Sequence, residues 1–273
     1  MFNKNELLLD KVRSLTAHDL ATGQMLFRLT SLEEPSIKCT AEGEEITDAV
    51  GSLITTMYRA KKAILSATNS LISLDLAAEQ YGSKKQIAGL KDYTYGNEAD
   101  ENATIEDYTY EILTAADGKI TLAHKASNEI KYIYSIENNE IGTMYVAGAA
   151  VSPTNFVVDN ETGDTTVISV PEGLTGKIYV EYQYKTLNAI RISNRASEFP
   201  RAVSMVVYAY FKDRCNENLV YSGKIICPKA KLNPEQVELA LTSTGKHPFE
   251  FTMMKDYCAE EGDDELFSII VSQ

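Results

Sequence analysis

The middle of the chain is a series of short β-rich runs separated by turn signals. Between residues 91 and 186, seven or eight such runs follow one another at intervals of 8 to 12 residues. Asp117-Gly118 and Asn138-Asn139 supply turn chemistry, and the closing run Ile178–Tyr184 alternates with period two, so one of its faces is buried. Strands at this spacing predict a β-sandwich. The sandwich is Ig-like by pattern alone, because the chain contains no Trp.

Segments of longer β-rich sequence lie on both sides of this module. Before it stand Met25–Leu29 and Ile37–Thr40, and after it come the runs Ala202–Lys212, Leu219–Cys227, Val237–Thr242, Phe249–Met254 and Leu266–Val271. We therefore predict an all-β, mainly antiparallel fold with one or two short helices. A discontinuous β domain formed by residues 1–94 and 187–273, a barrel or sandwich, is expected to be interrupted by the sandwich at 95–186.

Two segments have helical features. The opening arm Leu7–Leu15 places leucines and Val12 among charged residues at spacings compatible with a helix. Leu74–Tyr81 is followed by Gly82, the residue type favoured just past a helix end, which predicts a two-turn helix.

Two small groups of cations are the candidate sites of contact between subunits. We predict a hairpin of Ile46–Tyr58 with Ala63–Ile72, and its basic connection is formed by Arg59, Lys61 and Lys62. Pro228 is expected to end the strand from Leu219 or turn it between sheets, because proline removes a ladder donor. Lys229 and Lys231 are then expected to project from an exposed connection toward an acidic neighbour.

Charge and hydropathy narrow the classes of function. The chain of 273 residues has 26 Lys and Arg against 39 Asp and Glu, a net charge of −13. No basic stripe is visible in the sequence, so we expect no specific nucleic-acid binding and repulsion of a duplex. No run approaches the roughly 20 apolar residues that span a bilayer, and we expect a soluble protein without a signal peptide or a membrane partner.

Residues for catalysis or metal binding are sparse. The four cysteines lack CxxC spacing, and the three histidines stand alone. Cys227 lies in an apolar run and is expected to be a reduced core thiol. The acidic groups at 159–164 and 260–265 do not have EF-hand spacing, so solvated turns are favoured over calcium sites. We predict no catalytic residues, no metal, no cofactor and no enzymatic activity.

The order of the flanking segments resembles a known family. Ile46–Leu76 pairs a strand with a Ser/Thr/Asn-rich strand and a short helix, and Phe199–Val271 includes GKIICPKAKLNPEQVELALTSTGKHPFEFTMM. These stretches are similar to tail tube proteins and related virion structural proteins of tailed bacteriophages. The inserted sandwich resembles the Ig-like modules that many such proteins carry. About two thirds of the chain is covered by the tube-like part, through strand order and not through an invariant motif.

The resemblance implies a small β-barrel or sandwich with a flanking helix, assembled into hexameric rings. The rings stack into a tail tube that conducts double-stranded DNA without binding it specifically. The implied partners are further copies of the chain and other tail proteins, and the implied location is the virion tail, after synthesis in the bacterial cytoplasm. Two alternatives stay open: another phage virion component, or a module that uses its tyrosines, of which the chain has 16, to bind a cell-surface glycan.

Overall fold

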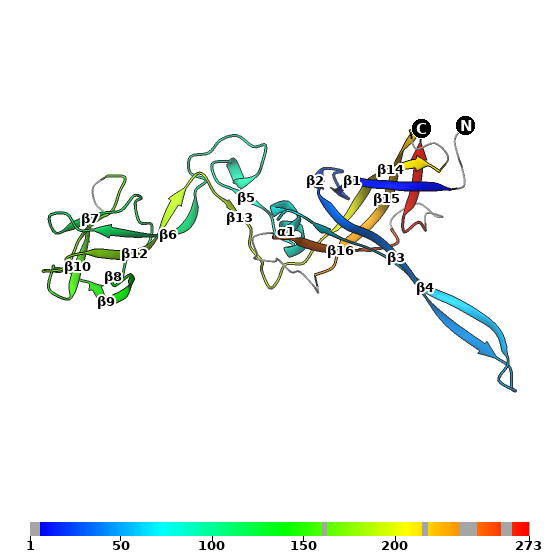
Figure 1. Cartoon of the computed structure of the whole chain (residues 1–273), viewed down its shortest axis with the longest axis horizontal. Helices are drawn as coiled ribbons and strands as arrows, with labels where there is room; N and C mark the ends of the chain where they lie inside the picture. The colour runs from blue at the N-terminus through cyan, green and yellow to red at the C-terminus, as the bar shows by residue number, and fades with distance from the viewer. Residues whose placement is uncertain (1–5, 160–162, 215–217, 235–244, 258–263, 273) are drawn as a thin grey trace. The chain divides into compact units, whose positions relative to one another are not determined.

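The protein is an all-β fold with one α-helix, which confirms the predicted fold class (Figure 1). The structure, a computed structural model, describes residues 6–159, 163–214, 218–234, 245–257 and 264–272. The chain forms two compact units: a first unit of Met1–Lys85 with Ile192–Gln273, and a second unit of Gln86–Arg191. The sequence analysis had placed the limits of the insertion at residues 95 and 186.

An eight-stranded antiparallel sheet, curled into a nearly closed barrel, makes up the first unit. Its strand order is β2-β1-β14-β15-β16-β4-β3, and β17 pairs with β15. The strands are β1 (Leu7–Asp19), β2 (Met25–Leu29), β3 (Leu32–Thr47), β4 (Leu53–Asn69), β14 (Ala202–Asp213), β15 (Val220–Leu232), β16 (His247–Met253) and β17 (Ser268–Ser272). The expected strand at Val237–Thr242 lies outside the described residues.

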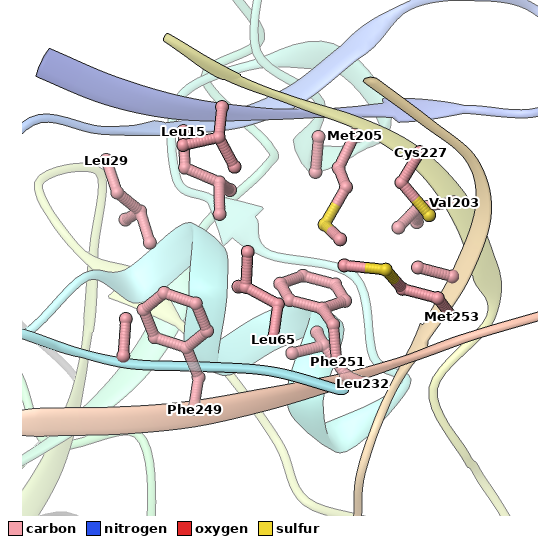
Figure 2. Close-up of a cluster of buried hydrophobic side chains, with 14 of the residues drawn as sticks. Leu15, Leu29, Leu65, Val203, Met205, Cys227, Leu232, Phe249, Phe251 and Met253 are labelled. Atoms are coloured by element: carbon pink, nitrogen blue, oxygen red, sulfur yellow. The ribbon is translucent and has the colours of Figure 1, made fainter. Parts of the chain in front are cut away.

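Side chains from six strands and the helix fill the barrel (Figure 2). β16 alternates strictly, with Phe249, Phe251 and Met253 buried between half-buried positions. Leu76 of helix α1 (Leu74–Tyr81) is fully buried in the same cluster. Cys227 is buried as predicted, and burial raises the pKa of its thiol to about 11.

The helix predicted at Leu7–Leu15 is wrong, since this segment belongs to strand β1. Its pairing with β14 shifts register between Leu9 and Lys11 and again between Val12 and Ser14. Each bulge adds a residue and breaks the period of two. The apolar residues then recur at intervals that imitate a helix although the backbone is extended.

The predicted hairpin of Ile46–Tyr58 with Ala63–Ile72 is wrong, because parts of both segments lie in one strand, β4, which pairs with β3. The turn lies at Asp48–Gly51, where the Asp48 carboxylate accepts hydrogen bonds from the Val50 and Ser52 amides at 3.0 and 2.7 Å. Gly51 has a φ of 86°, a conformation that glycine adopts without strain. The prediction placed the connection at Arg59–Lys62, inside β4, and ran a strand through the true turn at Asp48–Gly51.

The predicted helix at Leu74–Tyr81 is confirmed. The Ser73 hydroxyl accepts a hydrogen bond from the Leu76 amide at its start, and Gly82 ends it with a φ of 69°. A Cβ atom on Gly82 would lie 2.3 Å from the backbone oxygen of Phe199, so this glycine also permits a close approach of two chain segments.

Seven strands in the order β6-β12-β8-β9-β10-β11-β7 form the second unit. They are β6 (Ile105–Thr114), β7 (Lys119–Thr121), β8 (Tyr132–Glu137), β9 (Glu140–Ala147), β10 (Asn155–Asp159), β11 (Val167–Ser169) and β12 (Lys177–Thr186). Ile120 of β7 and Ile168 of β11 are buried in one cluster with Ile178 of β12, which indicates two layers that share a core. The turns predicted at Asp117-Gly118 and Asn138-Asn139 are present with positive φ angles.

The chain enters and leaves the second unit through a pair of short strands. β5 (Gln86–Ile87) pairs antiparallel with β13 (Ile190–Arg191), and a 3₁₀ turn at Lys91–Tyr93 follows β5. The two ends of the second unit are therefore adjacent, as an insertion requires.

Gly82→Ala is expected to destabilise the first unit more than Gly23→Ala does. Both glycines have a φ of 69°, but an added Cβ at Gly23 meets no atom within 4 Å. The free energy of unfolding should fall by about 1 to 2 kcal/mol in the control, Gly23→Ala, because of the left-handed conformation alone. In Gly82→Ala it should fall by about 3 kcal/mol or more. Urea unfolding measures both values, and equal losses would show that the contact with Phe199 relaxes freely.

Candidate functional site

One section of the first unit is a four-stranded sheet whose two outer strands are both edges. Its order is β1-β14-β15-β17, and one row of paired residues runs Lys11, Tyr210, Ser222 and Ser272. β2 covers β1 only from Leu15 to His18. Within the described ranges no strand pairs with the outer side of Leu7–Arg13 or with the outer side of β17. Two rows of backbone hydrogen-bonding groups are thus open to a partner strand.

Both open edges carry exposed aliphatic side chains. Leu8 and Leu9 on β1 are 57% and 52% exposed, and Ile269 and Ile270 on β17 are 57% and 49% exposed. Natural edge strands usually carry lysine, proline or a covering segment that prevents pairing with another chain. The β17 edge carries no charged residue, whereas the β1 edge combines its leucines with Lys11 and Arg13. The exposed aliphatic side chains of both edges favour association.

The directions of the two edges are complementary. Each pairing in the section is antiparallel, so β1 and β17 at its two sides run in opposite directions. β17 of one copy placed beside β1 of the next copy would continue the sheet in the same antiparallel pattern. A contact between two different edges is heterologous, and repeated contacts of this kind generate rings or filaments.

A second exposed feature of the first unit is the β3–β4 hairpin, whose outer half extends beyond the barrel (Figure 1). Its outer part carries exposed apolar side chains, with Val50 88% and Tyr58 76% exposed. The others are Ile46, Leu53, Ile54 and Met57. An isolated two-stranded ribbon is at best marginally stable in water, so a partner surface would stabilise this part.

The cations Arg59, Lys61 and Lys62 lie within strand β4 and not in an inter-strand loop as predicted. A bulge marks the position, because the pairing of β3 with β4 shifts between Thr40 and Glu42, and Ala60 has a φ of 52°. All three cations are exposed, and Arg59 forms an ion pair with Glu44 of the facing strand. They flank the apolar part of the hairpin.

The prediction that Lys229 and Lys231 project from an exposed connection after Pro228 is wrong. β15 continues through Pro228, and both lysines are half-buried. Lys229 Nζ lies 3.0 Å from Asp256 Oδ1 of the same chain. The missing donor of Pro228 is tolerated because the pairing is interrupted there: β17 covers β15 as far as Ile226, and β16 begins at Ala230.

A buried histidine, His247, links helix α1 to the sheet. Its Nδ1 accepts a hydrogen bond from the Ser73 amide at 3.3 Å, and its Nε2 lies 2.5 Å from Gln80 Oε1. Because Nδ1 accepts a hydrogen bond, the ring proton lies on Nε2, and Nε2–H donates a hydrogen bond to Gln80 Oε1. Burial lowers the pKa of His247, so the ring is neutral and serves as a structural bridge.

The described part of the chain holds no group of three or more His, Cys, Asp or Glu arranged to bind a metal ion. The acidic residues at 260–263 and 160–162 lie outside that part. Its helices include none with the length and apolarity needed to cross a bilayer. The open edges and the hairpin are the features with an evident capacity for contact. Sequence reasoning missed the edges because strand pairing brings together residues about 200 positions apart.

Lys229→Glu is expected to lower the free energy of unfolding by about 1 to 2 kcal/mol, since the Lys229–Asp256 pair is partly shielded from water. The charge-swapped double variant Lys229→Glu/Asp256→Lys should recover at least half of that loss. Urea unfolding of the two single variants and the double variant gives the coupling. Additive losses would show that Lys229 and Asp256 are not coupled in the folded chain.

No family model matches the chain, and no curated protein matches it either.

Proposed function

We propose that this chain is a self-assembling structural protein of a bacteriophage virion that forms stacked hexameric rings of a tail tube. The observation that carries the proposal is the four-stranded section β1-β14-β15-β17 with its two open, oppositely directed edges. Six copies joined β17 to β1 would close one continuous sheet into a ring. Closure pairs both open edges of the section, which is how β-barrels avoid uncontrolled pairing.

The rest of the first unit supports a ring with a defined inner side. One face of the four-stranded section is covered by the barrel core, which includes Val207 of β14 and Leu15 of β1. In the proposed ring the barrels lie on the outer side. The opposite face of the section then lines the bore.

The β3–β4 hairpin supplies a second contact in this proposal. Its apolar side chains extend beyond the barrel, where a neighbouring copy in the same ring or the next ring can cover them. Arg59, Lys61 and Lys62 would lie at the rim of that contact and fix its orientation more than its strength.

Blocking either open edge is expected to stop assembly. Leu8→Lys/Leu9→Lys blocks the β1 edge, and Ile269→Lys/Ile270→Lys blocks the β17 edge, because lysine on an edge strand disfavours pairing. Each variant alone should be monomeric by light scattering, whereas the wild-type chain forms rings or tubes in negative-stain micrographs. The matched control is Leu71→Lys/Ile72→Lys, which alters exposed residues outside any strand and should assemble normally.

Mixing the two blocked variants tests the head-to-tail arrangement directly. Each retains the edge that the other lacks, so the mixture should contain one-to-one dimers and no rings. A mixture that stays monomeric while the wild-type chain assembles would contradict pairing of β17 with β1. A wild-type chain that remains monomeric at all concentrations would contradict the proposed function itself.

A second candidate function is binding of a neutral polysaccharide by the outer face of the second unit. This tyrosine face consists of Tyr108, Tyr110, Tyr132, Tyr134 and Tyr179 on adjacent strands. The ring centroids of Tyr110 and Tyr179 are 5.4 Å apart, and Tyr134 meets Tyr179 edge-on at 6.3 Å. Exposed rings on a flat sheet face can stack on sugars, and their hydroxyls can bond with sugar hydroxyls. Gln86–Arg191 contains 16 acidic and 7 basic residues, which disfavours polyanionic glycans.

Tyr110→Ala/Tyr179→Ala is expected to abolish retardation of the chain in native gels that contain amylose, β-glucan or galactomannan. Tyr95→Ala is the control, because Tyr95 is 82% exposed and lies outside the tyrosine face. If none of these polysaccharides retards the wild-type chain, this second candidate is wrong.

A further inference from the structure

Cations from β1, β2, β14 and β15 lie on one side of the sheet that contains the four-stranded section. Tyr208 and Tyr210 of β14 point away from the barrel core, since the alternate residues Val207 and Ala209 are buried. Lys11 pairs opposite Tyr210 and Lys224 opposite Tyr208, so both lysines lie on this face. Arg28 of β2 is on the same face through its pairing with Thr16, which in turn pairs with Val206.

Two further cations complete this basic face, which we define as Lys11, Arg13, Arg28, Lys212 and Lys224 with Tyr208 and Tyr210. The Arg13 guanidinium lies 5.8 Å and the Lys11 ammonium 5.9 Å from the centre of the Tyr210 ring. Lys212 Nζ is 2.7 Å from Asp10 Oδ1, a carboxylate beside the cluster. Lys11, Arg13, Arg28 and Lys224 are exposed, and no described carboxylate lies within ion-pair distance of them.

From this arrangement we propose that the basic face binds the phosphate backbone of double-stranded DNA without regard to base sequence. Phosphate contacts from Lys and Arg depend on charge and position and carry no sequence information. Tyrosine hydroxyls between the cations add donors for phosphate oxygens. The Tyr210 ring is already covered by Lys11 and Arg13, so it offers no platform for stacking unpaired bases, and a duplex is favoured over a single strand.

The net charge of −13 does not oppose this inference at physiological salt. Charges more than about 8 Å apart are largely screened there, so the local excess of cations governs the contact. Repulsion of a duplex, as expected from composition, is therefore replaced on this face by weak attraction. The inference goes beyond self-assembly, because a single chain already carries the whole face.

The test is fluorescence anisotropy of a labelled duplex of arbitrary sequence with the full chain across a salt series. Four exposed cations predict a slope of log affinity against log salt of about −3 to −4. Lys11→Glu/Arg13→Glu should weaken binding at low salt at least about tenfold and make the slope shallower by about 2. The matched control, Lys119→Glu/Lys125→Glu, makes the same change of charge at exposed positions of the second unit and should bind as the wild-type chain does.

Four results would overturn the proposal. The first two are that the wild-type chain does not bind the duplex at low salt, and that the control variant loses as much duplex affinity as Lys11→Glu/Arg13→Glu. The other two are that the chain prefers single-stranded DNA, and that it binds phosphatidylserine vesicles in place of the duplex. Light scattering of the same samples records assembly separately. Duplex binding without assembly would contradict only the tail tube proposal, and assembly without duplex binding only this one.

Discussion

Strand β15 is the element on which the first unit depends. Along its 13 residues it pairs with β14 on one side, and on the other side with β17 and then with β16. The change of partner at Pro228 lets one strand belong both to the barrel and to the open four-stranded section. If this strand ended at Pro228, the section would lose its pairing with β16. The open edge at β17 and the continuous barrel wall therefore both depend on that continuity.

Local sequence signals predicted the elements whose hydrogen bonds are local. Helix α1 with its Gly82 end and the glycine and asparagine turns of the second unit were found because their chemistry lies within a few residues. The two bulges of β1 and the one near Ala60 of β4 were not found. Bulges are set by pairing with a distant strand, so a single strand's periodicity does not reveal them.

The surfaces were harder to predict than the elements. The basic face joins residues near position 11, Arg28, and residues near positions 212 and 224, none of which forms a run of like charge. The visible runs were less informative: Lys229 pairs within its own chain, and Arg59 pairs with Glu44 across its hairpin. Charge counted along a sequence describes solubility and long-range repulsion, whereas contact depends on which residues share one side of a sheet.

The paired strands β5 and β13 make the second unit an insertion whose two ends are adjacent. Paired strands lie about 4.8 Å apart. A different domain whose two ends are equally close can therefore replace the residues between β5 and β13 without distorting the first unit. The barrel does not use the second unit's core, since the two clusters of buried residues have no member in common. A chain built in this way can acquire, exchange or lose a surface domain by recombination while its scaffold stays the same.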